Sequence, residues 1–258
     1  MNSRDYLLSS DQNDHPVLVL GHSLGTNFSL WNAVLGRLEE KFKVLRYNPH
    51  CRQGGNRAGS IAGVGAELVR LLDHLGFARV DFCGLSMSGL LGQWLALEVP
   101  DRIGNLVLSN TAARIGVPEA WQERMTLIRQ KGLSAVASDL VHRWFSPAFI
   151  GQEPKVVERF TNDLCLFPTE DYLAGCEAIR DADFCERAGR IKTRTLIIAG
   201  SQDHAATLAD AEFLNQRIRG SQLLVLPCGH LACVESAGAF TRAVIEFLTQ
   251  SNFSLNGR

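Results

Sequence analysis

The sequence predicts an α/β protein with a mostly parallel central sheet, helices on both faces of that sheet and an inserted helical cap. Short apolar segments alternate along the chain with longer segments of helical pattern, which is typical of parallel strands connected by helices. The alternation stops between about residues 117 and 189, where only helical patterns occur. We therefore expect a core of residues 1–116 and 190–258 and a cap of residues 117–189.

The strands are predicted from short apolar runs bounded by turn residues. The first four runs are VLVLG, KVLRYN, RVDFCG and NLVLSN, at residues 17–21, 43–48, 79–84 and 105–110. Two later runs, RTLIIAG and SQLLVLP, predict strands at residues 194–200 and 221–227. The carboxyl ends of parallel strands meet at one edge of the sheet, and open α/β sheets bind their ligands there.

Helical patterns connect these strands at residues 30–41, 61–75 and 87–97, and each of the two late strands is followed by another. Four further patterns fill the interrupting segment, at residues 118–132, 133–146, 154–167 and 169–183. Proline and glycine residues stand where these helices are expected to begin and end: Pro118, Gly132, Pro147, Pro154 and Pro168. We expect this helical cap to cover the carboxyl ends of the strands.

The composition excludes several classes of partner. The chain has 258 residues, with 26 Lys and Arg, 27 Asp and Glu, and a net charge of −1, so nothing indicates nucleic acid or an anionic membrane. No apolar stretch approaches the roughly 18 residues of a membrane span, and no secretory signal is predicted. Seven scattered cysteines without zinc-ligand spacing predict reduced thiols in a cytoplasmic protein that holds no metal. The oligomeric state stays open.

The segment DFCGLSMSGLLGQW places Ser86 directly between a predicted strand and a predicted helix. This is the setting of a nucleophile elbow, G-x-S-x-G, in which a sharp turn lifts the serine hydroxyl above the sheet edge. Gly84 occupies the first glycine position, but Ser88 replaces the last glycine and Gly89 follows it. We expect the elbow to stay intact but to be tighter, because serine adds a β-carbon and a hydroxyl. The alternative is a small residue at an ordinary turn between a strand and a helix.

A nucleophilic serine needs a base, and the base needs an orienting acid. Asp203 follows the strand at residues 194–200, and His230 follows the next strand along the chain. Both are therefore expected at the same sheet edge as Ser86, in the chain order typical of this elbow. His204 is the rival base, although it is expected to point away if Asp203 points inward. The end of the strand at residues 105–110 is the other place for an acid, but it carries Asn110.

The tetrahedral intermediate of acyl transfer needs two backbone N–H donors. One is expected from Met87, directly after the nucleophile. The other is expected from GHSLGTNFSLW, whose glycines permit an unusual backbone path. Within it, Ser23 is the favoured donor and Leu24 the alternative. A glycine-rich turn without a catalytic role is also compatible with this segment.

Several segments, in this order, resemble the 3-oxoadipate enol-lactonases of the α/β-hydrolase superfamily. They are GHSLGTNFSLW, FCGLSMSGLLGQWLALEVPDRIGNLVLSNTAARIG, RWF, CEAI, SQDHAAT and GHLACVE, within about residues 17–248. The elbow and the triad positions are common to the whole superfamily, whereas NTAARIG and CEAI are more specific to this branch. The resemblance implies a catalytic triad of Ser86, Asp203 and His230 under a helical cap.

The resemblance also implies the activity. The enzyme would open the lactone ring of 3-oxoadipate enol-lactone through an acyl-enzyme, in the β-ketoadipate pathway, without metal or organic cofactor. Its small-molecule substrate carries a carboxylate, for which Arg143 is the candidate cation, and Trp144 would wall the pocket. Alternatively, Arg143 and Trp144 are a surface arginine beside a core tryptophan. His22 and Arg114 are then the next candidate cations for the substrate carboxylate. A different ester hydrolase and a non-catalytic receptor remain alternative functions.

The chain departs from the family pattern at three places. Ser88 stands where the family usually has glycine. Residues 48–59 read NPHCRQGGNRAG, where the family usually has an Asp-x-Arg-Gly-His-Gly-x-Ser loop. Only one strand, at DYLLSS, fits before VLVLG, where the family has two.

Overall fold

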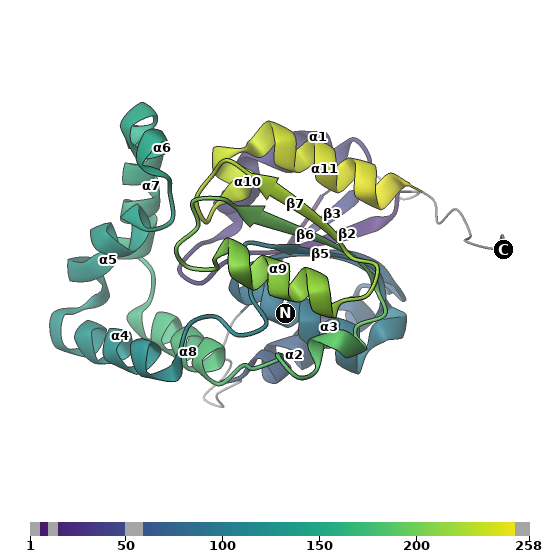
Figure 1. The fold of residues 1–258 in the computed structure, drawn as a ribbon, viewed down its shortest axis with the longest axis horizontal. Coiled ribbons are helices and arrows are strands. Elements are labelled where there is room, and N and C mark those ends of the chain that lie inside the picture. Colours follow the sequence, from purple (N-terminus) through teal and green to yellow (C-terminus); the bar gives the residue numbers. More distant parts are fainter. Residues whose placement is uncertain (1–5, 10–14, 50–58, 251–258) are drawn as a thin grey trace, which may run out of the picture.

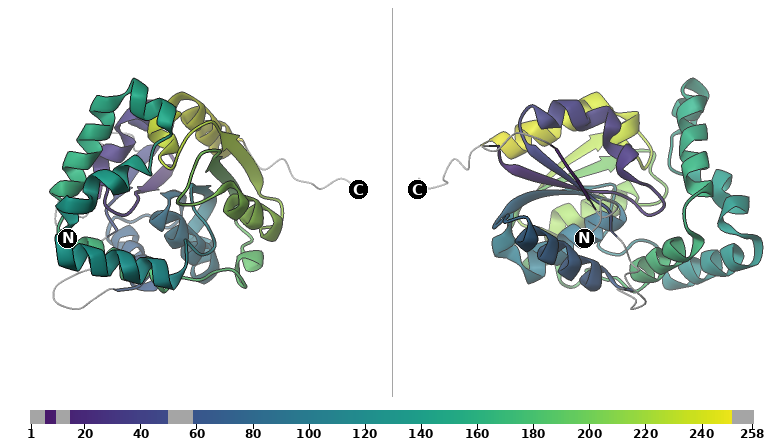
Figure 2. Two further views of the ribbon diagram at one scale, coloured as in Figure 1. Left: turned by 60° about the vertical axis from the view of Figure 1, so that its left-hand side comes forward. Right: turned by 180° about the vertical axis from the view of Figure 1, so that it is seen from behind.

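The computed structural model describes residues 6–9, 15–49 and 59–250, which form a seven-stranded sheet with helices on both faces (Figure 1 and Figure 2). The strands lie in the order β1-β3-β2-β4-β5-β6-β7. β1 pairs antiparallel with β3, and the other neighbouring strands in this described sheet are parallel. The predicted α/β fold class is therefore confirmed.

The six strands predicted from apolar runs are all present, with ends within two residues of those expected. The strands are β1 Tyr6–Leu8, β2 Val17–Gly21, β3 Lys43–Tyr47, β4 Val80–Leu85, β5 Ile103–Ser109, β6 Arg194–Gly200 and β7 Gln222–Leu226. Every residue of the central strand β4 is buried, because helices cover both faces of the sheet. β4 continues to Leu85, one residue further than its apolar run predicts, and so leads directly into Ser86.

Two groups of helices sandwich the sheet. The core helices are α1 Asn32–Glu39, α2 Ile61–His74, α3 Met87–Glu98, α9 Leu208–Arg217, α10 Ala232–Glu235 and α11 Ala237–Thr249. Helices α1 and α11 lie together on one face, and α2, α3 and α9 lie on the other (Figure 1 and Figure 2). The helix expected at residues 30–41 begins as a 3-10 turn, Phe28–Trp31, where the Asn27 side chain caps the backbone N–H of Ser29.

The segment between β5 and β6, described throughout, contains helices and no strand. Its helices are α4 Pro118–Lys131, α5 Leu133–His142, α6 Pro147–Gln152, α7 Pro154–Cys165 and α8 Thr169–Arg180. They stand beside the end of the sheet toward which the strand arrows point (Figure 1). Helix α6 was missed by the sequence analysis, since six residues are too few to show helical periodicity. Its start is nevertheless encoded, by Pro147 and by Ser146, whose hydroxyl accepts from Phe149 N.

An aromatic cluster holds part of this helical segment together. The rings of Phe145 and Phe149 stack with centroids 5.1 Å apart, and the Phe160 ring lies 5.5 Å from that of Phe145. Trp144 meets Phe160 edge to face at 6.5 Å. Such pairs contribute about 0.5–1.5 kcal/mol each beyond the apolar area they bury. They join the turn after α5 to helices α6 and α7.

The thiols of the described cysteines, Cys83, Cys165, Cys176, Cys185, Cys228 and Cys233, form no disulfides. Burial raises the pKa of Cys83 and Cys233 above its ordinary value, which keeps these thiols protonated.

Within the described ranges, no helix combines the length and apolarity that crossing a membrane requires. Most of residues 48–59, where the sequence differs from the family pattern, lies outside the described residues.

Helix α3, which begins directly after Ser86, packs closely on α2 through Gly65. A β-carbon at Gly65 would lie 2.2 Å from the Trp94 ring, whereas a β-carbon at Gly36 in α1 would meet nothing within 4 Å. We expect Gly65→Ala to lower the melting temperature, because overpacking costs about 1–3 kcal/mol. Gly36→Ala should raise it, since alanine favours a helix over glycine by about 0.5–1 kcal/mol. Thermal unfolding of both variants tests this, and a similar rise in both would contradict the close packing.

Candidate active site

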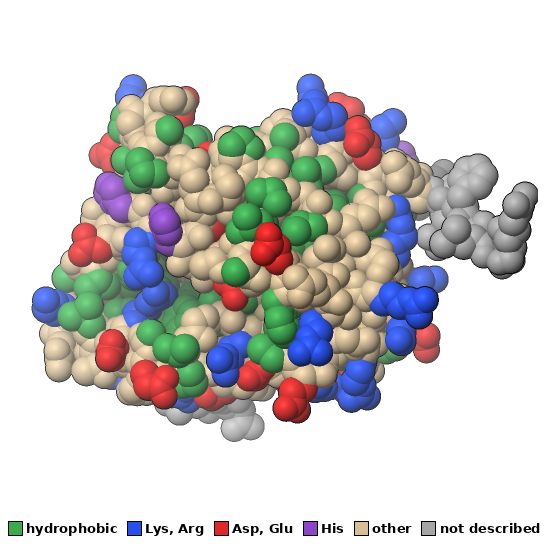
Figure 3. All heavy atoms as spheres, viewed as in Figure 1, with side chains coloured by type: hydrophobic (Ala, Val, Ile, Leu, Met, Phe, Trp, Pro, Cys, Tyr) green, Lys and Arg blue, Asp and Glu red, His purple; other side chains and the backbone are tan. Residues whose placement is uncertain are grey.

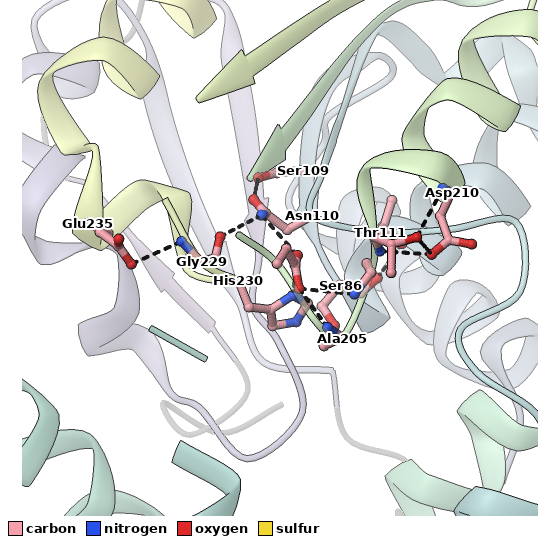
Figure 4. A network of polar contacts seen from close by, with 12 residues as sticks. Ser86, Ser109, Asn110, Thr111, Ala205, Asp210, Gly229, His230 and Glu235 are labelled. Atoms are coloured by element: carbon pink, nitrogen blue, oxygen red, sulfur yellow. Dashed lines mark hydrogen bonds and ion pairs between the residues drawn. The ribbon is translucent and has the colours of Figure 1, made fainter. Parts of the chain in front are cut away.

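Ser86 has a left-handed backbone, with φ 57° and ψ −114°, at the junction of β4 and α3. This conformation is costly for a residue with a β-carbon and persists only where surrounding contacts hold it. The Ser86 N–H donates to Ser109 O at 3.0 Å, and the Ser86 carbonyl accepts from Thr111 Oγ1 at 2.8 Å; Figure 4 labels these three residues. The Ser86 carbonyl also accepts from Gly89 N at 2.8 Å. The end of β5 and the first turn of α3 therefore fix the elbow that the sequence predicts.

Gly84, at the first glycine position of the motif, cannot be replaced by a larger residue for steric reasons. A β-carbon at Gly84 would lie 2.1 Å from the Ser88 carbonyl oxygen, which is backbone and cannot move aside. Ser88 itself is fully buried and donates its hydroxyl to His22 O at 2.7 Å. Ser88 therefore does more than enlarge the residue at this position, because its hydroxyl joins α3 to the segment that follows β2.

Asp203 and His230 lie together, as their positions after β6 and β7 predict. His230 Nδ1 donates to Asp203 Oδ2 at 2.7 Å, within the network of polar contacts that Figure 4 shows. Both side chains are buried. The other carboxylate oxygen accepts from Ala205 N at 2.7 Å and Ala206 N at 3.0 Å. Burial by itself would raise the pKa of Asp203, but the charge and hydrogen bond of His230 and these two N–H groups outweigh it, so the pKa lies below its usual value.

Asn110 is a part of this arrangement that the sequence analysis considered only as a place where an acid is absent. It follows β5 with a left-handed φ of 47°, which asparagine tolerates better than most residues. Its Nδ2 donates at 3.1 Å both to Asp203 Oδ2 and to Gly229 O (Figure 4). Ser109 Oγ donates to its Oδ1 at 2.7 Å and fixes the orientation of the amide. Asn110 thus joins the segments after β5, β6 and β7.

Glu235 joins the His230 segment to the helical segment. Its Oε2 accepts from Gly229 N at 3.0 Å and from Ser146 N at 3.1 Å. The His230 N–H in turn donates to Trp144 O at 2.7 Å. A β-carbon at Gly229 would lie 2.8 Å from the Trp144 carbonyl oxygen, so only glycine allows this approach. Because of these contacts, the turn after α5 has a fixed position relative to His230.

A cavity of about 160 Å³ lies between the carboxyl ends of the strands and the helical segment. Ser23, Ser86 and His230 line it from the sheet side. This volume is below the roughly 300–1,000 Å³ of pockets for drug-sized ligands, so it suits a small substrate. Figure 3 shows hydrophobic side chains within the hollow and basic and histidine side chains at its edge. His204 is exposed and is among the residues that line the cavity.

Arg143 and Trp144 both line this cavity from the helical segment, as do Arg124 and Tyr172, which the sequence analysis missed. Arg143 is exposed, whereas Arg124 is half-buried, with its guanidinium carbon 4.4 Å from the centroid of the Trp121 ring. Burial raises the pKa of Tyr172, and a hydrogen bond and charge from Arg124 oppose that rise only in part. The single arginine expected from the sequence is therefore one of two at this wall.

The two alternative cations lie elsewhere. Arg114 pairs with Asp183 at 3.4 Å, with both side chains largely exposed. His22 Nε2 lies 2.9 Å from Asn48 Oδ1 and lines a neighbouring hollow. Neither residue lines the cavity of Ser86.

Ser23 and Met87 are the two residues whose backbone N–H groups the sequence analysis expects as oxyanion donors. Met87 is the first residue of α3, where helix geometry leaves the N–H without an intrahelical acceptor. Ser23 follows β2, and its carbonyl accepts from Thr26 N at 3.2 Å and Thr26 Oγ1 at 2.8 Å. Among the described residues, the Ser23 N–H donates to no other group. Ser23 lines the cavity of Ser86, whereas Met87 lines the neighbouring hollow.

The contact between Asn110 and Asp203 predicts a pH-dependent cost for one substitution. Asn110→Asp places a second carboxylate beside Asp203 and should lower stability by about 1–3 kcal/mol near neutral pH. The pair would then share a raised pKa, so the loss should shrink as the pH falls through that value. Asn110→Ser removes the donor without adding charge, and its cost should depend little on pH. Melting temperatures at about pH 8 and about pH 5 test this, and equal pH dependence in both variants would contradict it.

Comparisons with known proteins agree with this geometry. Residues 48–237 match the family model of the alpha/beta hydrolase fold. The chain is 39% identical over 248 residues to 3-oxoadipate enol-lactonase 2 of Acinetobacter baylyi, covering 93% of this chain and 91% of the relative. It is 29% identical to 3-oxoadipate enol-lactonase 1 of the same organism, covering 90% and 88%. The crystal structure of the enol-lactonase from Burkholderia xenovorans matches with a TM-score of 0.90 and 37% identity, over 95% of this chain and 96% of that one. The protein is therefore a hydrolase that belongs to the α/β-hydrolase fold family.

Proposed function

We propose that this hydrolase opens the lactone ring of 3-oxoadipate enol-lactone and yields 3-oxoadipate, as a step of the β-ketoadipate pathway. The observation that carries the proposal is the hydrogen-bonded pair of Asp203 and His230 at the cavity of Ser86, faced by two arginines. Similarity to named enol-lactonases supports the choice of substrate. We place the reaction in the cytoplasm, where free thiols such as those of the described cysteines persist.

In the first half of the reaction, His230 takes the proton of Ser86 Oγ as this oxygen bonds to the lactone carbonyl carbon. The N–H groups of Met87 and Ser23 stabilise the negative oxygen that develops there. The ring C–O bond then breaks and its electron pair leaves with the enolate oxygen. The enolate gains, at carbon, the proton that His230 took from Ser86, which yields the 3-oxo group and leaves His230 neutral for the second half. Asp203 holds the Nδ1–H of His230, so that Nε2 is the nitrogen free to exchange the proton.

In the second half, His230 removes a proton from water, and the resulting hydroxide attacks the acyl ester on Ser86. The bond between the acyl carbon and Ser86 Oγ breaks, and the serine oxygen recovers its proton from His230. The new carboxylate is the second carboxylate of the product. These steps consume one water per lactone and require no metal or organic cofactor.

The substrate carboxylate would bind at the wall formed by the helical segment, and residues 117–189 would act as the cap over the core of residues 1–116 and 190–258. Arg143 would pair with the carboxylate, and Trp144 would wall the pocket. Arg124 is the second cation within the cavity, already oriented by its contact with Trp121. Because Trp144 O accepts from His230 N, the carboxylate site and the base would keep a constant separation.

We expect Ser86→Ala to lower the turnover of the lactone by on the order of 10⁴–10⁶ without unfolding the protein, as the loss of a triad nucleophile does. The loss of the enol-lactone absorbance measures turnover, and circular dichroism checks the fold. Ser201→Ala, which changes an exposed serine after β6, should keep the wild-type rate. A Ser86→Ala protein that retained more than about a tenth of the activity would remove Ser86 from the mechanism.

We expect Arg143→Ala to lower kcat/KM for the lactone by about 10- to 150-fold, because a charge-assisted hydrogen bond contributes roughly 1.5–3 kcal/mol. Hydrolysis of nitrophenyl acetate, which lacks the carboxylate, should change by less than about threefold. Arg124→Ala tests the second cation in the same way. Arg159→Ala is the matched control, since Arg159 also stacks on a ring, 4.8 Å from the centroid of Phe160, but does not line the cavity. Equal losses on both substrates would assign Arg143 to the stability of the cap.

A further inference from the structure

Ser88 lies at the position where the elbow motif has its last glycine, and its side chain has a specific partner. The residue has no exposed surface, and its hydroxyl donates to His22 O at 2.7 Å, across 66 positions of sequence. Its β-carbon and hydroxyl would both lie 2.7 Å from a β-carbon placed on Gly21. The side chain thus fills the space between the first turn of α3 and the end of β2.

The acceptor of this bond belongs to the same peptide group as the Ser23 N–H. A trans peptide group is planar, and its C=O and N–H point in opposite directions. A hydrogen bond that fixes the direction of His22 O therefore also fixes the direction of the Ser23 N–H. The next peptide group is held as well, because the Ser23 carbonyl accepts from Thr26. Both peptide groups that flank the Cα of Ser23 are thus restrained by hydrogen bonds to their carbonyls.

The bond also links the two N–H groups that would hold the oxyanion. Met87 is the first residue of α3 and Ser88 is the second, so one helical turn contributes the first donor directly and orients the second through a side chain. A hydrogen bond accepted by a carbonyl polarises its peptide group and makes the N–H of that group a stronger donor. Catalysis by an oxyanion hole depends on donors that are oriented before charge develops.

We propose that Ser88 is a positioning residue for the oxyanion hole, which orients the Ser23 N–H through the His22–Ser23 peptide group. The proposal deepens the proposed function and rests on its assignment of Ser23 and Met87 as oxyanion donors. The competing view is that the hydroxyl only stabilises the packing of α3 on β2. The two views differ in what they predict for transition-state binding.

The test compares Ser88→Ala with Thr241→Val. Ser88→Ala keeps the β-carbon that packs near Gly21 and removes only the hydroxyl. Thr241→Val removes another buried hydroxyl, which donates to Ala237 O at 2.7 Å within α11, away from the cavity. Both variants should lose stability. Removal of a direct oxyanion donor lowers kcat by about 10²–10³. Ser88→Ala keeps the Ser23 N–H but no longer holds its direction, so kcat should fall by roughly 10-fold. KM should stay within about threefold, because the substrate carbonyl carries little charge.

The measurements are kcat and KM for nitrophenyl acetate and for the enol-lactone, melting temperatures, and inhibition by phenylboronic acid. This acid adds to a nucleophilic serine and places a negative oxygen where the oxyanion forms. Its affinity should weaken in Ser88→Ala by the same factor as kcat and stay unchanged in Thr241→Val. Unchanged kcat and boronic acid affinity, with a lower melting temperature in both variants, would overturn the proposal. If Ser88→Ala does not fold, Ser88→Cys keeps a weak donor and should retain part of kcat and boronic acid affinity; full retention of both would overturn the proposal.

These measurements distinguish a failure of the proposal for Ser88 from a failure of the proposed enol-lactone hydrolysis. A wild-type protein that hydrolyses the nitrophenyl ester but not the enol-lactone would overturn the choice of substrate, while the ester and the boronic acid would still test Ser88. A wild-type protein that turned over neither substrate and did not bind the boronic acid would lack an oxyanion hole and would overturn both.

Discussion

The left-handed backbone of Ser86 is the constraint on which the rest of the site depends. A turn this sharp directs the serine side chain out of the sheet edge, but it costs free energy of roughly 1–3 kcal/mol that neighbouring contacts must offset. Ser109, Thr111 and Gly89 provide three hydrogen bonds to the Ser86 backbone. Two of these come from the end of β5 and the residues that follow it, so the elbow depends on the pairing of β4 with β5. Ser86 is therefore held by the most buried part of the sheet.

Polar groups at the carboxyl ends of three adjacent strands satisfy one another around this elbow. The buried Asp203 carboxylate accepts four hydrogen bonds, from His230, Asn110 and two backbone N–H groups. A carboxylate this well satisfied stays ionised although it is buried, which is the state that orients the imidazole. Asn110 also donates to Gly229 O, so the segments that carry Asp203 and His230 are joined directly. The site is one connected network rather than separate side chains.

The same network extends into the helices that line the cavity. Glu235 accepts from the Gly229 N–H beside His230 and from the Ser146 N–H in the helical segment, and Trp144 O accepts from His230 N. The turn that bears Arg143 is thus connected to the histidine through backbone contacts. Ser88 extends the connections in the other direction, to the peptide group before Ser23. The turn that bears Arg143, the His230 imidazole and the Ser23 N–H therefore belong to one hydrogen-bonded frame, which is the arrangement that the proposed reaction needs.

Local sequence patterns determine the strand positions and the elbow of this protein. Apolar runs and turn residues place the strands within two residues, and the setting of Ser86 between a strand and a helix indicates the elbow, because these features depend on neighbours in the chain. The loop order after β6 and β7 likewise predicts the contact of Asp203 with His230. Contacts across long separations were not predictable. Asn110, Glu235 and Arg124 carry no local signal, and Ser88 looks like a mere enlargement until its hydroxyl meets His22 O. Only the tertiary structure decides such contacts, because their partners are brought together by sheet pairing and helix packing and not by adjacency in the chain.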